Sequence, residues 1–240
     1  MKIAVISCLH GNEKYGLEVI NKLPSHISSF IGNKKAVKEN KRFIDVDLNR
    51  CFPGKDNGNN EEKIANELLK KLRDFDYVID LHSTSNNCPL FGIITKPNKP
   101  KIEFAEKLGL KKLVIMSPRY ASGKSLIDHV KCGISLEIGP HEQKENVNDT
   151  YNILKNLIYQ RKTHTKLEIF EVFSVIKKNK QDILINNFEN IRKGQIIAKD
   201  NLGNQKADFN FTAILVGEKS YSDVLCLACR KISSIQTLLS

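Results

Sequence analysis

Two histidines and one glutamate have the types and positions of a hydrolytic metal site. His10 and Glu13 follow an apolar run at residues 3–6, and His82 ends a second run at residues 78–81. Two imidazoles and one carboxylate form the three-ligand set of catalytic zinc sites, which leave a further position open for water. All three lie where a buried strand is expected to give way to a loop, the usual place for ligands in an open α/β sheet. The sequence therefore predicts one Zn²⁺ per chain.

Glu137 is a candidate general base, because it interrupts an apolar strand pattern at residues 134–138. Burying a carboxylate is costly unless it is paired or lies near a metal. Beside a metal, a carboxylate of raised pKa can take a proton from water. A strand-end glutamate that reaches solvent is the alternative interpretation. Asp80 has the position of a carboxylate that orients a ligating imidazole through its second ring nitrogen.

The segment at residues 42–50 carries a candidate recognition site for a carboxylate. Its alternation of apolar and polar residues predicts a strand over residues 42–48. Asn49 and Arg50 follow at the strand end, and a guanidinium presents a planar fork of donors that matches a carboxylate. A surface arginine and a turn asparagine are the alternative, and Arg42 has the same two interpretations.

Strand-like and helix-like segments alternate over the first two thirds of the chain. Apolar runs predict further strands at residues 2–8, 77–81, 90–95, 113–116 and 134–138. Apolar residues at helical spacing predict helices near 14–23, 61–73, 100–109, 123–131 and 147–161. This order predicts an α/β fold in which helices flank a parallel or mixed sheet.

The pattern changes after Arg161, where short β-like runs and glycine turns replace the alternation. We therefore expect a catalytic α/β domain at residues 1–163 and a small β-rich domain at residues 164–240. Cys226 and Cys229 lie in one expected strand and so face opposite ways, which favours a structural role over metal binding.

Composition describes an ordinary globular protein, with 40% hydrophobic and 27% charged residues. No apolar run approaches the roughly 20 residues that span a bilayer, and the first residues lack a secretory pattern. We therefore expect a cytoplasmic protein without membrane contact. Six scattered cysteines without secretory context do not indicate a disulfide framework.

The net charge of +11 arises mainly from lysines that are spread along the chain. Nucleic-acid-binding proteins concentrate basic residues on one face together with stacking aromatic residues, and this chain has no tryptophan. A solvated lysine-rich surface is therefore favoured over nucleic-acid binding. The same positive field would steer small anionic substrates toward a cleft.

Taken together, four motifs resemble the aspartoacylase/succinylglutamate desuccinylase family, which is related to zinc carboxypeptidases. In chain order they are His-Gly-Asn-Glu at 10–13, Arg-Phe-Ile-Asp-Val-Asp-Leu-Asn-Arg at 42–50, Asp-Leu-His-Ser-Thr at 80–84 and Leu-Glu-Ile-Gly-Pro at 136–140. The β-rich tail is also similar to that family's C-terminal domain, which caps the active site. The resemblance implies a zinc-carboxypeptidase-like mixed sheet.

The resemblance also implies a role for each candidate residue. Zinc would be held by His10, Glu13 and His82, with Glu137 as general base and proton donor and Arg42 polarising the scissile carbonyl. Residues implied to bind the substrate are Asn49, Arg50, Tyr120, Lys124 and Tyr221. The resemblance further implies a deacylase for an N-acyl amino acid, and the expected substrate is a small acidic compound such as N-acetylaspartate.

Two departures from the family affect recognition of a second substrate carboxylate. Lys124 stands where aspartoacylases usually have arginine, and Val224 where they tend to carry lysine. The sequence leaves the acyl group, the amino acid and a homo-oligomeric state open. A zinc carboxypeptidase-type peptidase, and a basic nucleic-acid- or anion-binding protein with a vestigial site, are the alternatives.

Overall fold

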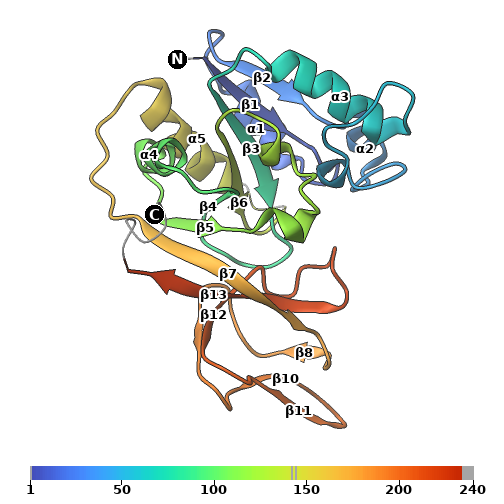
Figure 1. The fold of residues 1–240 in the computed structure, drawn as a ribbon, viewed down its shortest axis with the longest axis vertical. Coiled ribbons are helices and arrows are strands. Elements are labelled where there is room, and N and C mark those ends of the chain that lie inside the picture. Colours follow the sequence, from blue (N-terminus) through green and yellow to red (C-terminus); the bar gives the residue numbers. More distant parts are fainter. Residues whose placement is uncertain (1, 142, 144, 234–240) are drawn as a thin grey trace.

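The computed structural model describes residues 2–141, 143 and 145–233, and Figure 1 shows its strands and helices. The strands of the larger sheet, in chain order, are β1 (Ile3–Ser7), β2 (Ser28–Ile31), β3 (Tyr77–Ser83), β4 (Phe91–Ile94), β5 (Lys112–Ile115), β6 (Gly133–Ile138), β7 (Glu168–Lys177), β9 (Asn190–Ile191), β12 (Phe211–Ile214) and β13 (Val224–Ile232). A smaller sheet contains β8 (Asp182–Ile183), β10 (Ile196–Asp200) and β11 (Gly203–Lys206).

Five α-helices accompany these sheets: α1 (Tyr15–Asn21), α2 (Lys34–Glu39), α3 (Asn60–Leu72), α4 (Lys99–Leu108) and α5 (Glu145–Ile158). Three short 3₁₀ turns lie at η1 (Leu48–Arg50), η2 (Pro118–Ala121) and η3 (Leu126–Asp128). No helix in the described part of the chain is both long and apolar enough to cross a membrane.

Helices cover both faces of the larger sheet because its central strands are apolar on both sides. Along β1, Ile3 and Val5 pack in one hydrophobic cluster with residues of α1, α4 and α5. The alternate residues Ala4 and Ile6 pack in another cluster with residues of α3. This arrangement confirms the predicted α/β fold with a sheet flanked by helices (Figure 1).

The three strands that carry the candidate chemistry are parallel neighbours. The sheet order is β2-β1-β3-β6-β4-β5-β7-β13-β12-β9, in which β3 pairs in parallel with both β1 and β6. The carboxyl ends of β1, β3 and β6 therefore meet at one edge of the sheet. His82 lies directly beside Glu137 in the register of β3 and β6.

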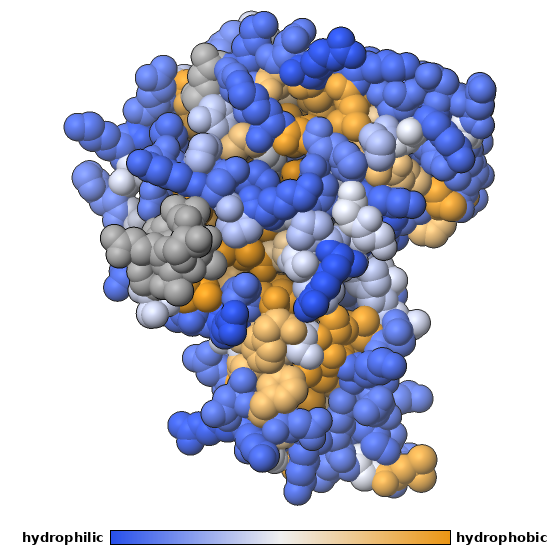
Figure 2. All heavy atoms as spheres, in the orientation of Figure 1, coloured by the Kyte–Doolittle hydropathy of each residue, from blue (hydrophilic) through white to orange (hydrophobic). Residues whose placement is uncertain are grey.

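The C-terminal segment is β-rich, as predicted, and its strands extend the same sheet. β7 pairs in parallel with β5, and β13 pairs antiparallel with β7, so the larger sheet is mixed. Cys226 and Cys229 of β13 pack in two different hydrophobic clusters, which fits their structural role. Figure 2 shows hydrophilic side chains over most of one face, with hydrophobic side chains in patches on the upper part and along the narrower lower part. The division into a catalytic domain at residues 1–163 and a capping domain at residues 164–240 stays a prediction.

Two predicted elements are wrong. Residues 42–48 form no strand, because the backbone N–H groups of residues 44–46 donate to the Glu61 carboxylate instead of to a neighbouring strand. Residues 123–131 contain only the short turn η3, since the Asp128 side chain accepts from Ser125 and closes a single turn. The short elements β2, α2, β8, β9 and β11 were not predicted.

Candidate functional site

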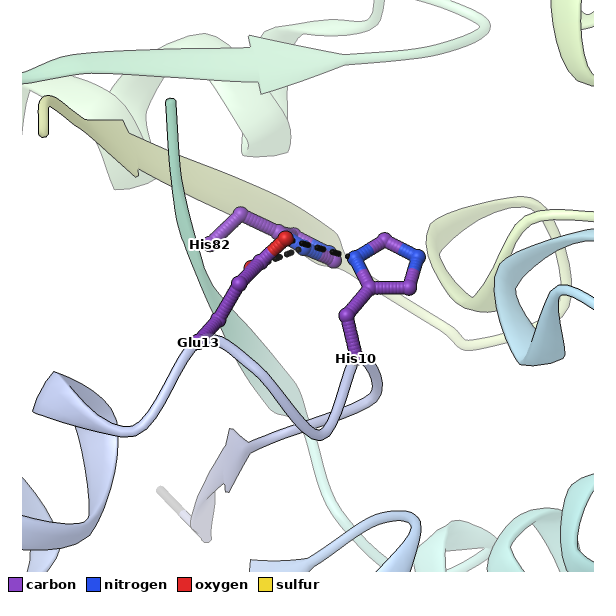
Figure 3. A group of neighbouring side chains, drawn as sticks. All are labelled: His10, Glu13 and His82. Atoms are coloured by element: carbon purple, nitrogen blue, oxygen red, sulfur yellow. Dashed lines mark hydrogen bonds and ion pairs between the residues drawn. The ribbon is translucent and has the colours of Figure 1, made fainter. Parts of the chain in front are cut away.

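His10, Glu13 and His82 meet at the carboxyl edge of β1 and β3 (Figure 3). The Glu13 carboxylate lies between the two imidazoles, with Oε1 at 2.8 Å from His10 Nδ1 and Oε2 at 3.1 Å from His82 Nδ1. All three residues are buried, and their potential ligand atoms lie within 4.8 Å of one another. The predicted ligand set is therefore assembled, with both imidazoles presenting the same ring nitrogen to one point.

A second carboxylate holds the far side of each imidazole. His82 Nε2 donates to Asp80 Oδ2 at 2.6 Å, and His10 Nε2 donates to Asp47 Oδ1 at 3.0 Å. Such carboxylate–histidine pairs fix the ring orientation and make the other nitrogen a better metal ligand. The structure thus gives Asp80 the orienting position predicted from sequence, and adds Asp47, which the sequence analysis did not single out.

The turn that carries His10 and Glu13 packs tightly on the start of α2. A Cβ atom on Gly11 would lie 2.2 Å from the carbonyl carbon of Ala36, so only glycine fits there. The Gly11 N–H donates to the carbonyl of Arg42 at 3.1 Å. The unpredicted helix α2 therefore directly supports the turn that carries His10 and Glu13.

The charges around this cluster fit a divalent cation. Burial opposes ionisation of Glu13, yet the two histidines hold the pKa of Glu13 well below its ordinary value. Burial likewise opposes protonation of His82, yet Asp80 and Glu13 raise the pKa of His82 well above its ordinary value. The carboxylates of Glu13, Asp47 and Asp80 contact the two imidazoles, and Arg42 pairs with two of these carboxylates. Two imidazole nitrogens and a carboxylate oxygen are the donors that zinc prefers.

Glu137 lines the same pocket from β6, beside His82. Burial, reinforced by the charges of Glu13 and Glu218, raises the pKa of Glu137 to about 8. A carboxyl group with a pKa near neutrality can both accept and return a proton.

Arg42 reaches the cluster from the loop between α2 and η1. Its Nη2 donates to Asp47 Oδ2 at 3.0 Å, and its Nη1 lies 3.5 Å from Glu13 Oε1. The guanidinium also lies over the ring of Tyr221, 5.9 Å from the centroid. Arg42 is thus a fixed positive charge next to the predicted metal position.

Asn49 and Arg50 join this site to the C-terminal segment. Asn49 Oδ1 accepts from the backbone N–H of Leu126, and its Nδ2 lies 3.4 Å from His82 Nε2. Arg50 Nη2 donates to the hydroxyl of Tyr221 at 2.7 Å. Residues 49 and 50 therefore lie between the ligand cluster and the segment that closes the pocket.

The pocket has a volume of 220 Å³ and brings together all the predicted site residues except one. Tyr120 and Tyr221 line it, whereas Lys124 is exposed and does not. Glu218 is a lining residue that sequence reasoning missed; its carboxylate accepts two bonds from the backbone N–H of Ser85, at 3.0 and 3.1 Å. The one signal for Glu218 was its place three residues before Tyr221.

Known proteins similar to this chain agree with the fold and the motifs. Residues 1–160 match the model of the succinylglutamate desuccinylase/aspartoacylase catalytic domain. Over 188 residues the chain is 28% identical to "N-acyl-aromatic-L-amino acid amidohydrolase (carboxylate-forming) B" of Danio rerio, covering 65% of this chain and 60% of that protein. Over 182 residues it is 29% identical to a probable aspartoacylase of Acaryochloris marina, covering 66% and 62%. The matched part thus spans about three fifths of these relatives.

Solved structures share the fold over nearly the whole chain. Murine aminoacylase 3 superposes with a TM-score of 0.80 at 21% identity, covering 97% of this chain and 95% of that one. A succinylglutamate desuccinylase/aspartoacylase from Rhodobacter sphaeroides superposes with a TM-score of 0.75 at 14% identity, covering 97% and 86%. These structures confirm the predicted fold class, and the family model covers two thirds of the sequence. The chain belongs to the succinylglutamate desuccinylase/aspartoacylase family.

Proposed function

We propose that this protein is a zinc-dependent amidohydrolase that removes the acyl group from an N-acyl amino acid. The observation that carries the proposal is the buried set of His10, Glu13 and His82 with Glu137 directly beside it. When bound by these three residues, zinc supplies a Lewis acid and lowers the pKa of water in the site.

Glu137 acts as the proton carrier of the reaction. It accepts a proton from the attacking water and returns that proton to the leaving amine, so one group serves as base and then as acid. Its raised pKa and its place beside His82 suit both steps. Arg42 faces the same point and stabilises the negative charge that develops on the amide oxygen.

Arg50 and Asn49 hold the carboxylate of the substrate. The Arg50 guanidinium is positioned by the Asn49 carbonyl at 2.8 Å and by the Tyr221 hydroxyl, and it lines the pocket. A guanidinium whose two Nη atoms are already hydrogen-bonded loses little conformational entropy when it binds a carboxylate. Asp47 and Asp80 keep the two imidazoles in place during turnover.

The pocket geometry favours a small substrate over a peptide. The segment that carries Glu218 and Tyr221 closes one side of the pocket through contacts with Ser85 and Arg50. A long peptide would have to displace these contacts, which disfavours the peptidase alternative. A binding protein without catalytic activity has no evident use for a half-buried carboxylate of raised pKa beside three candidate metal-ligand side chains.

Replacement of Glu137 by glutamine tests this function. We expect Glu137→Gln to keep one zinc per chain and to lose about 10²–10⁴-fold in kcat on N-acetyl amino acids, because a general acid–base group contributes that much. Glu106→Gln, an exposed change on α4, is the matched control and should retain full activity. Near-wild-type hydrolysis by zinc-loaded Glu137→Gln would overturn the proposal.

A further inference from the structure

The pocket has one wall that the proposed reaction does not use. Five aliphatic residues line it and belong to a single hydrophobic cluster; we call them the apolar wall: Ile93, Met116, Ile127, Leu215 and Leu227. They come from β4, the segment after β5, η3, the segment after β12, and β13. The apolar wall therefore forms where the N-terminal helices and strands meet the C-terminal segment, and its residues belong to no single sequence motif.

The charged residues of the pocket leave no cation for the apolar wall. Among the described lining residues, Arg42 and Arg50 are the only lysines or arginines. Arg42 is already paired with Asp47 and Glu13, and Arg50 is the proposed partner of one substrate carboxylate. Lys124, expected to bind a substrate carboxylate, is exposed outside the pocket.

A second carboxylate on the substrate would also find no complementary charge at the apolar wall. Glu137 and Glu218 also line the pocket and offer no positive charge, and burial raises the pKa of Glu218. A carboxylate placed against the apolar wall would lose its water without gaining a cation, which is unfavourable. An aliphatic or aromatic group there would gain contact and release water.

We propose that the substrate carries an apolar group that packs on the apolar wall, and that N-acyl derivatives of apolar amino acids are preferred to N-acetylaspartate. This inference rests on the proposed deacylase function and narrows its substrate class. The apolar group can belong to the amino-acid side chain or to the acyl chain, since both would meet the same wall.

Steady-state kinetics of the zinc-loaded full chain test the preference. We expect kcat/KM for N-acetyl-L-leucine and N-acetyl-L-phenylalanine to exceed that for N-acetyl-L-aspartate by about 100-fold or more, because even one methylene in an apolar pocket can change kcat/KM by 10–200-fold. N-hexanoylglycine separates the two sources: if it is hydrolysed faster than N-acetyl-L-leucine, the acyl chain occupies the wall. N-acetyl-L-aspartate as the best substrate would overturn the inference while leaving the deacylase function intact.

A charge introduced beside the apolar wall gives a second test. Val224 lines the pocket at the first residue of β13 and is partly exposed, so Val224→Lys should fold. It should lower kcat/KM for N-acetyl-L-leucine about tenfold and raise it for N-acetyl-L-aspartate. Ile196→Lys, at a partly exposed site outside the pocket, should leave both values unchanged. Identical substrate ratios for Val224→Lys and the wild type would contradict the inference.

Calorimetry separates this inference from the reaction itself. If zinc-loaded protein hydrolyses none of the substrates, the proposed function fails, and binding of N-acetyl-L-leucine and N-acetyl-L-aspartate still tests the pocket. We expect tighter binding of the leucine compound with a negative heat-capacity change, the mark of apolar burial. Equal or weaker binding of the leucine compound would overturn the inference.

Discussion

Replacing Glu61 by glutamine should destabilise the protein and misplace catalytic groups that Glu61 never touches. The Glu61 side chain is fully buried and accepts hydrogen bonds on both oxygens, one of them from Asn60 Nδ2 at 3.1 Å. Its Oε1 accepts from Asn33 Nδ2 at 2.7 Å and from the backbone N–H of Ile44 at 2.8 Å. Its Oε2 accepts from the backbone N–H groups of Asp45 and Val46 at 3.1 and 3.4 Å. One carboxylate thus replaces the strand partner that residues 42–48 lack.

Glutamine can satisfy only one side of this arrangement. The glutamine amide nitrogen must take the place of either Oε1 or Oε2. At least two hydrogen bonds are then lost, because the N–H groups at that position would face an NH₂ group that cannot accept them. A hydrogen bond to a charged group is worth about 1.5–3 kcal/mol, so Glu61→Gln should lower the free energy of unfolding by about 3–6 kcal/mol. Glu67→Gln, an exposed change on the same helix, should stay within about 0.5 kcal/mol of the wild type.

The catalytic effect follows from what lies at each end of this loop. Arg42 and Asp47 flank residues 44–46, and they contact Glu13 and His10 respectively. A displacement of about 1 Å can cost about 100-fold in rate. We expect kcat of Glu61→Gln to fall by that order while zinc content stays near one per chain.

Urea unfolding followed by circular dichroism, metal analysis and steady-state kinetics measure the three effects. The reasoning is refuted if Glu61→Gln unfolds at the same urea concentration as Glu67→Gln and retains wild-type kcat.

Three further predictions concern pH, the metal and the substrate. Burial raises the pKa of Glu61, yet hydrogen bonds from the backbone hold this pKa below its ordinary value, so the stabilisation by Glu61 is full above about pH 4.3 and is lost as pH falls through the folded-state pKa. The difference in unfolding free energy between the wild type and Glu61→Gln should therefore shrink in acid. A constant difference would contradict this. Asp80→Asn should weaken zinc binding about 10–100-fold in chelator competition, since the imidazole loses its carboxylate; unchanged affinity would show that this carboxylate is dispensable. Tyr221→Phe removes the hydroxyl that holds Arg50 and should raise KM about 3–10-fold with little change in kcat, whereas Lys124→Ala should change neither; equal effects in both variants would refute the pocket assignment.

The sequence predicts the cluster of His10, Glu13 and His82 because the signal for each residue is local. Each ligand follows or ends an apolar run, and β1, β3 and β6 form where those runs predict strands. Parallel pairing then brings the strand ends together without further information. The convergence of these side chains therefore follows from where the strands lie and how they pair.

The segment at residues 42–48 could not be predicted in the same way. Its alternating pattern is typical of a strand, yet its backbone N–H groups donate to the carboxylate of Glu61, which lies in α3. Only the tertiary structure decides between the two partners. The apolar wall could not be predicted from the sequence for a similar reason, because its residues come from five separate segments of the chain.

Zinc-dependent hydrolysis by the purified full chain is the most direct test of the central claim. We expect metal analysis to find one zinc per chain, chelation to abolish hydrolysis of N-acyl amino acids, and added zinc to restore it. His82→Ala should lose both the metal and the activity, because His82 is one of the three proposed ligands in the described site. A chain that hydrolyses these substrates equally well without metal, or that keeps its zinc after His82→Ala, would contradict the claim.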